Sequence, residues 1–188
     1  YFTHRPIDAS IELATKHDLK PENIDSVTVD FPTFHYVNRP QPETGLDGKF
    51  SVQYATTVAL LDRKVKVATF SDKRRFSADV KDLLPRVKLN MRDDIPRSFQ
   101  DCYAIVTVNT KDGQEFMERC DKPRGIWGIP LTRNERLAKF RDCCELALPS
   151  EHTEQLIKII EGLDSLDNVT ELMDIIRDGK AITPEWNG

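Results

Sequence analysis

The chain lacks the features that would place it on a membrane or a nucleic acid. Its longest apolar stretches, such as residues 55–61, are far shorter than a bilayer span, and residues 1–9 have no hydrophobic signal core. Positive charge is not in excess either, because the formal net charge is -4 and the only compact basic cluster is residues 73–75. Phosphate binding needs a basic surface, so we expect no nucleic-acid partner and no membrane partner.

Cysteine is scarce and its spacing is uninformative. Cys102, Cys120, Cys143 and Cys144 do not form the paired motifs of zinc or iron–sulfur sites, so the sequence predicts no metal centre. Cys102 and Cys120 fall on the two arms of a predicted hairpin, where a cross-strand disulfide is geometrically possible. Reduced cysteines are nevertheless expected, since nothing in the sequence indicates secretion.

What is present is typical of a globular protein. The 188 residues are 39% hydrophobic and 31% charged, with no internal repeat and no low-complexity run. This length suits one ordinary domain, or one domain with an appendage. The chain opens at Tyr1 without an initiator methionine, which favours a piece of a longer protein.

Apolar periodicity predicts alternating helices and strands. The Asp112-Gly113 pair predicts a tight hairpin turn, and Thr132 with Glu135 predicts a capping box. The expected helices are 6–17, 49–62, 77–84, one from Thr132 to near Pro149, one around 156–163 and one around 172–176; the expected strands are 24–31, 87–91, 101–110 and 114–120.

These elements predict an α+β fold, in which helices pack on a mostly antiparallel sheet of about four strands and further helices follow. We expect residues 1–131 to form the smaller α+β domain and residues 132–188 to form C-terminal helices with a polar tail at 184–188. The apolar stripes of these last helices exceed what one sheet face can cover, so they are expected to pack on a larger helical partner. An N-terminal helical domain missing from this chain is the expected partner.

Four side chains are candidates for chemistry. His4 precedes a predicted helix, where the helix dipole favours a neutral ring and a bound anion; a capping or packing histidine is the alternative. Tyr36 could donate a proton and Arg39 could hold a carboxylate, although spacing alone favours a loop that packs by its aromatics. Lys49 opens a predicted helix, which suits an anion or is simply a polar helix start.

Four short segments stand out in this order along the chain: 3–9 (Thr-His-Arg-Pro-Ile-Asp-Ala), 24–29, 49–55 and 131–140. Together they resemble the MmgE/PrpD family. The resemblance covers this chain from His4 to about Ile176. The part of the family's proteins that it matches is their C-terminal half. Within the family, the stretch Tyr36 to Pro40 (Tyr-Val-Asn-Arg-Pro), Phe99, the hairpin 106–118 and residues 156–160 are most similar to the animal-type decarboxylases that convert cis-aconitate to itaconate.

The resemblance implies a lyase without cofactor or metal. A large helical domain and a smaller α+β domain would enclose a site for a small polycarboxylate, usually in a homodimer. Tyr36 matches the tyrosine that the decarboxylases place in the cleft, and His4 matches the histidine leading into the domain's first helix. Arg39, from the same stretch as Tyr36, is a further substrate contact, and the positive charge of Lys49 suits the same carboxylates. The family's lysine and a further cleft histidine would precede Tyr1, so the chain alone is expected to be inactive.

Two other functions remain open at this point. The same residue types would serve 2-methylcitrate dehydratase or a related hydro-lyase or epimerase, in which a base removes a proton beside a carboxylate. A noncatalytic α+β interaction module that offers its helical tail to a partner is the third reading. A cytoplasmic location is expected, or a mitochondrial one if the protein is eukaryotic and a targeting segment precedes this chain.

Overall fold

The computed structural model describes residues 1–178. The chain divides into two compact units, the first ending at Pro130 and the second beginning at Leu131. Each unit has its own internal packing, and each is described separately below. The polar tail expected at 184–188 lies outside the described residues.

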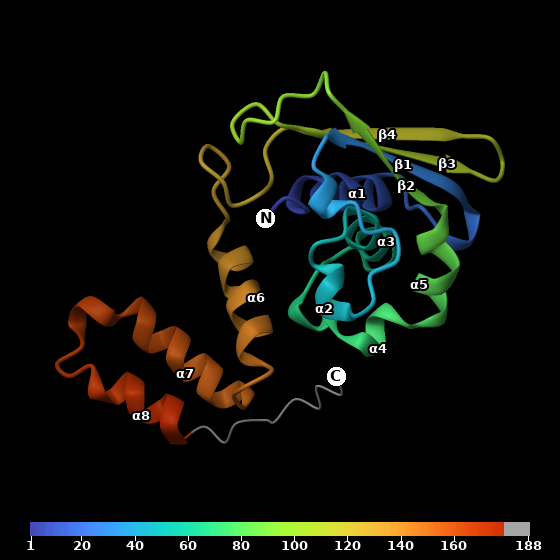
Figure 1. The fold of residues 1–188 in the computed structure, drawn as a ribbon. Helices are drawn as coiled ribbons and strands as arrows, with labels where there is room; N and C mark the ends of the chain where they lie inside the picture. The colour runs from blue at the N-terminus through green and yellow to red at the C-terminus, as the bar shows by residue number, and fades with distance from the viewer. Residues whose placement is uncertain (179–188) are drawn as a thin grey trace. The chain divides into compact units, whose positions relative to one another are not determined.

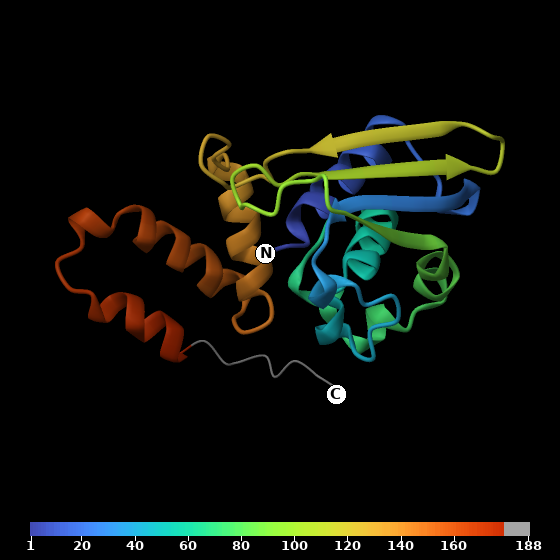
Figure 2. The same ribbon diagram turned by 45° about the horizontal axis from the view of Figure 1, so that its top comes forward.

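The first unit contains a four-stranded sheet with the strand order β2-β1-β3-β4 (Figures 1 and 2). β1 (Ile24–Pro32) pairs antiparallel with β3 (Ala104–Thr110), and β3 pairs antiparallel with β4 (Glu115–Cys120). β1 also pairs with β2 (Val87–Arg92), but in parallel. The α+β prediction is confirmed, and the sheet is mixed, because the long helical crossover from β1 brings β2 back in the same direction.

Two helices pack on one face of this sheet, α1 (His4–Lys16) and α3 (Val52–Asp62) (Figure 1). α3 is buried continuously from Val52 to Leu60, so it is the central helix of the core. Buried and more exposed side chains alternate along the strands, as expected for a sheet covered on one face. Val27, Val29 and Phe31 of β1 are fully buried and belong to the hydrophobic core.

The helix expected at 49–62 begins three residues later than predicted. A short α2 (Gly45–Gly48) ends at Lys49, and α3 begins only at Val52. The break occurs at Ser51, whose Oγ accepts a hydrogen bond of 2.9 Å from the Tyr54 backbone amide and thereby caps α3. Lys49 therefore lies at the end of α2 rather than at the start of α3. The prediction that Lys49 opens a helix is wrong.

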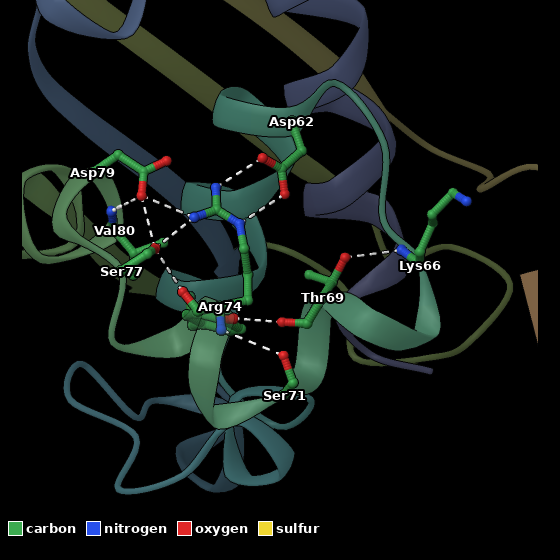
Figure 3. A network of polar contacts seen from close by, with 9 residues as sticks. Asp62, Lys66, Thr69, Ser71, Arg74, Ser77, Asp79 and Val80 are labelled. Atoms are coloured by element: carbon green, nitrogen blue, oxygen red, sulfur yellow. Dashed lines mark hydrogen bonds and ion pairs between the residues drawn. The ribbon is translucent and has the colours of Figure 1, made fainter. Parts of the chain in front are cut away.

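The crossover continues through α4 (Asp72–Arg75) and α5 (Ala78–Leu83), which are tied to α3 by a polar network around Arg74 (Figure 3). The Arg74 guanidinium donates to both oxygens of Asp62 at 2.7 and 3.0 Å and to Asp79 at 2.9 Å. Hydrogen bonds from Arg74 and Ser77 lower the pKa of Asp79 to about 2. With two carboxylates already bound, Arg74 serves the fold.

The second unit contains α6 (Arg133–Cys144), α7 (Ser150–Glu161) and α8 (Thr170–Asp178). The predicted capping box is present, because the Glu135 amide donates to Thr132 Oγ1 and the Thr132 amide donates to the Glu135 carboxylate. Two bidentate ion pairs join α6 to α7, Arg133 with Glu161 and Arg141 with Glu154, each with a closest contact of 2.6 Å. The expectation that these helices pack on a further helical domain stays a prediction.

All four cysteines are free, so the disulfide considered for Cys102 and Cys120 is absent from the structure. Burial raises the pKa of the Cys120 thiol to about 12, and burial also raises that of Cys102. Cys143 is exposed on α6. Among the helices of residues 1–178, none combines the length and apolar character that a membrane span requires.

Candidate functional site

An aromatic cluster gathers where the start of α1 meets three loops of the first unit. The 3-10 turn after β1, the loop between β2 and β3, and the loop after β4 each contribute a ring. Ring centroids of neighbouring members lie 4.4 to 6.1 Å apart. The aromatic cluster comprises Tyr1, Phe2, His4, Phe34, Tyr36, Phe99 and Trp127.

His4 is the first residue of α1, one position further into the helix than the sequence suggested. Its side chain is exposed, and its ring lies 5.3 Å from that of Tyr1. The N-cap residue Thr3 makes no side-chain hydrogen bond to the helix. His4 is thus presented in the first turn, where the partial positive charge of the helix favours an anion.

Tyr36 lies in a 3-10 turn, His35–Val37, directly after β1. Its side chain is 49% exposed, while its ring packs against Phe2 at 5.1 Å and Phe34 at 5.6 Å. Partial burial, and secondarily the nearby Cys102 thiol, raises the pKa of the Tyr36 phenol. At neutral pH the hydroxyl therefore keeps its proton and can donate it.

The fold brings His4 and Tyr36 to one cluster although they are far apart in the sequence. His4 contacts Tyr1, Tyr36 contacts Phe2, and the rings of Tyr1 and Phe2 lie 6.1 Å apart. A hydrophobic bridge thus joins the imidazole to the phenol. One cluster thus contains an imidazole and a phenol, two groups of the kind that serve in proton transfer.

Arg39 follows Tyr36 in the same loop but is already occupied. Its Nη1 donates to the Asp47 carboxylate, and its Nε donates to the Tyr36 carbonyl oxygen at 3.1 Å. The guanidinium also lies 5.4 Å from the Phe50 ring centroid. The carboxylate that Arg39 holds in this structure is therefore the chain's own, and a hollow of about 290 Å³ adjoins the pair.

Lys49 is exposed at the end of α2, with Nζ 5.8 Å from the ring centroid of Phe70. Phe70 is not a member of the aromatic cluster, so this contact does not place Lys49 at the cluster.

Sequence reasoning missed a buried arginine beneath the cluster. Arg5 is only 2% exposed, and it donates to the carbonyl oxygens of Phe99 at 2.7 Å and Asp121 at 2.9 Å. Its guanidinium lies 5.4 Å from the Phe99 ring, which in turn packs against Trp127 at 4.9 Å. Arg5 therefore fixes two loops to α1, and the only available signal was its position beside His4.

The C-terminal domain of the MmgE/PrpD family matches residues 1–165, which is most of the chain. The chain belongs to the MmgE/PrpD family. It is 31% identical to cis-aconitate decarboxylase of Mus musculus over 182 residues, and 30% identical to cis-aconitate decarboxylase of Homo sapiens over 180 residues. Each alignment covers 93% of this chain and 37% of the relative, so the chain spans little more than a third of these proteins.

All four candidate residues fall inside the MmgE/PrpD match, as do the aromatic cluster and the first two helices of the second unit. α8 begins beyond it, at Thr170. Within residues 1–178, no group of three or more histidine, cysteine or acidic side chains is placed to hold a metal ion.

Proposed function

We propose that the protein containing this chain is a lyase that decarboxylates cis-aconitate to itaconate without a cofactor. The observation that carries this proposal is the 31% identity to mouse cis-aconitate decarboxylase across 93% of the chain. The decarboxylase is preferred over the other chemistries of the family because both curated relatives bear that name.

The proposed reaction needs one proton and a place for negative charge. Loss of carbon dioxide leaves the electron pair of the broken carbon–carbon bond in conjugation with the adjacent double bond. Protonation at the far carbon of this allylic carbanion gives itaconate, so one proton enters for each carbon dioxide released. A neutral acid close to a cationic pocket is sufficient for this step.

Tyr36 is the proposed proton donor, and His4 is proposed to position the substrate or to return the proton. The raised pKa of Tyr36 keeps the phenol protonated at neutral pH, and its side chain is half exposed. Both residues belong to the aromatic cluster, whose rings would shield the carbanion from bulk water.

Arg39 and Lys49 are the proposed substrate-binding residues. Asp47 and the Tyr36 carbonyl engage Nη1 and Nε of Arg39, and its Nη2 has no partner among residues 1–178. A substrate carboxylate could therefore bind the remaining edge of the guanidinium while Asp47 holds the other. The large helical domain, the homodimer and the cytoplasmic or mitochondrial location belong to the same proposal.

The test is proton NMR of cis-aconitate incubated with the full-length product of the gene that encodes this chain. Appearance of itaconate supports the decarboxylase. A parallel incubation with 2-methylcitrate separates the alternatives, because loss of water there without decarboxylation of cis-aconitate would move the assignment to a dehydratase. The 188-residue chain is expected to show neither reaction, because it spans 37% of the length of its relatives.

A further inference from the structure

A buried glutamine reaches from the central helix to the loop that carries Tyr36. Gln53, in the first turn of α3, is 2% exposed. Its Nε2 donates a hydrogen bond of 2.6 Å to Oδ1 of Asn38. Asn38 lies between Tyr36 and Arg39 in sequence, and its side chain is exposed.

Keeping this amide inside the protein destabilises the fold. Gln53 Oε1 is buried and has no hydrogen-bond partner among residues 1–178. Thr56, one turn further along α3, is also buried, and its Oγ1 likewise has no hydrogen-bond partner among residues 1–178. A buried polar atom without a partner costs about 1–3 kcal/mol, so a leucine or methionine would suit stability better.

The hydrogen bond from Gln53 engages the oxygen of the Asn38 amide. An amide group has an acceptor oxygen on one side and a two-proton donor on the other. With Oδ1 engaged by Gln53, the Nδ2 group is left for a further acceptor, and the Asn38 side chain is exposed. Among residues 1–178, Nδ2 of Asn38 donates to no acceptor.

We propose that Asn38 is a carboxylate-binding residue of the active site, and that Gln53 is the positioning residue that turns its amide toward the substrate. This inference rests on the proposed polycarboxylate lyase function. The Nδ2 group of Asn38 would donate to a carboxylate oxygen beside Tyr36 and Arg39. A neutral donor at this point binds the anion without adding a charge that would raise the acidity of the Tyr36 phenol.

The sharpest test is Asn38→Asp in the full-length enzyme. An aspartate keeps an oxygen that accepts from Gln53, but it replaces the Nδ2 donor with a negatively charged acceptor. The KM for cis-aconitate should rise about 10- to 100-fold, the range set by a lost hydrogen bond to a charged group, while kcat changes less than about threefold. Asn23→Asp is the matched control, because Asn23 is exposed at the opposite end of β1 and the change in charge is identical.

Gln53→Met tests the positioning role separately. It removes the hydrogen bond that orients Asn38 while keeping an unbranched side chain in the core, so KM should rise about threefold to tenfold and the thermal midpoint should not fall. If Asn38→Asp does not fold, Asn38→Ala provides the same measurement, since it also removes the donor.

The possible outcomes separate the inference from the function on which it rests. If the wild-type enzyme forms itaconate and the KM of Asn38→Asp equals that of wild type, the inference fails and the decarboxylase stands. An equal rise in KM for Asn23→Asp, or a fall in kcat with no change in KM, also overturns it. Absence of wild-type turnover on cis-aconitate overturns the proposed function, and the inference with it.

Discussion

The ring of Phe2 packs edge-on against the ring of Tyr36, with 5.1 Å between their centroids. This contact joins the segment before α1 to the turn after β1, so the phenol is held from a part of the chain remote from it in sequence. Edge-to-face pairs contribute about 0.5–1.5 kcal/mol beyond the area they bury. The orientation of Tyr36 therefore depends on the short segment that leads into α1, whose first residue is His4.

Replacing Tyr36 with phenylalanine in the full-length enzyme should lower kcat roughly 100-fold or more, because only the proton-donating hydroxyl is lost and the ring contacts remain. The initial rate of itaconate formation measures this. Tyr103→Phe is the matched control, because the Tyr103 ring stacks against Arg119 at 3.6 Å and is no part of the aromatic cluster. Wild-type turnover in Tyr36→Phe would remove Tyr36 from the mechanism.

Arg39 and Asp47 should show only modest coupling in stability. Their side chains are 42% and 26% exposed, so solvent screens the ion pair. A double-mutant cycle of Arg39→Gln and Asp47→Asn, measured by urea denaturation of the 188-residue chain, should give about 0.5–1 kcal/mol. A coupling energy well above 2 kcal/mol would mean that Arg39 serves the fold rather than the substrate.

The stability of the first unit should depend on pH through Asp79. Its pKa is lowered from 3.8 to about 2, chiefly by Arg74, so the folded state favours the ionised carboxylate. The stabilisation is thus fully present above about pH 4 and is lost as the pH falls toward 2. Because Asp79 is 51% exposed, we expect at most about 1 kcal/mol after solvent screening.

Urea denaturation of wild type and Asp79→Asn between pH 5 and pH 2 measures this contribution. The difference in unfolding free energy between them should shrink as the pH falls. In an Arg74→Gln background the difference should be small at every pH, because the partner that lowers the pKa is gone. A difference that is independent of pH in the wild-type background contradicts the assignment.

Gly45→Ala should destabilise the chain by about 1–3 kcal/mol, the usual cost of overpacking. A Cβ at Gly45 would lie 2.3 Å from the Ser71 carbonyl carbon and 2.5 Å from the Phe70 carbonyl oxygen, and this backbone cannot move aside. Thermal denaturation measures the change. Gly162→Ala is the control, since its nearest neighbour would be the Lys158 carbonyl oxygen at 3.4 Å and an effect within about 0.5 kcal/mol is expected.

Local patterns predicted the elements well where turn chemistry is specific. Asp112-Gly113 fixed the hairpin, with Gly113 at φ +83°, and the Thr132 capping box placed the start of α6. The helix expected from residue 49 begins only at Val52, because Ser51 is its N-cap and was taken for an interior polar residue. The parallel pairing of β2 with β1 could not be predicted from the sequence. Alternation of apolar and polar residues shows which side chains share a face of a strand, but it shows neither the neighbouring strand nor its direction.

The candidate site was predictable only in part. The resemblance to the family pointed to Tyr36 and His4, and the structure unites them through Tyr1 and Phe2, neighbours that no spacing rule connects to Tyr36. Arg39 was expected to bind a foreign carboxylate, and its capture by Asp47 depends on the short α2 helix that the sequence did not reveal. Tertiary contacts decide such details, so sequence patterns alone do not carry them.

The burial of Cys120 has a practical consequence for labelling. A thiol whose pKa is raised to about 12 holds almost no thiolate at pH 7, and the thiolate is the form that reacts with maleimides. Burial also raises the pKa of Cys102 and of Cys144, whereas Cys143 is exposed. Brief treatment with a maleimide dye should therefore mark α6 at Cys143 first, which provides a fluorescent reporter for the second unit without any engineered cysteine.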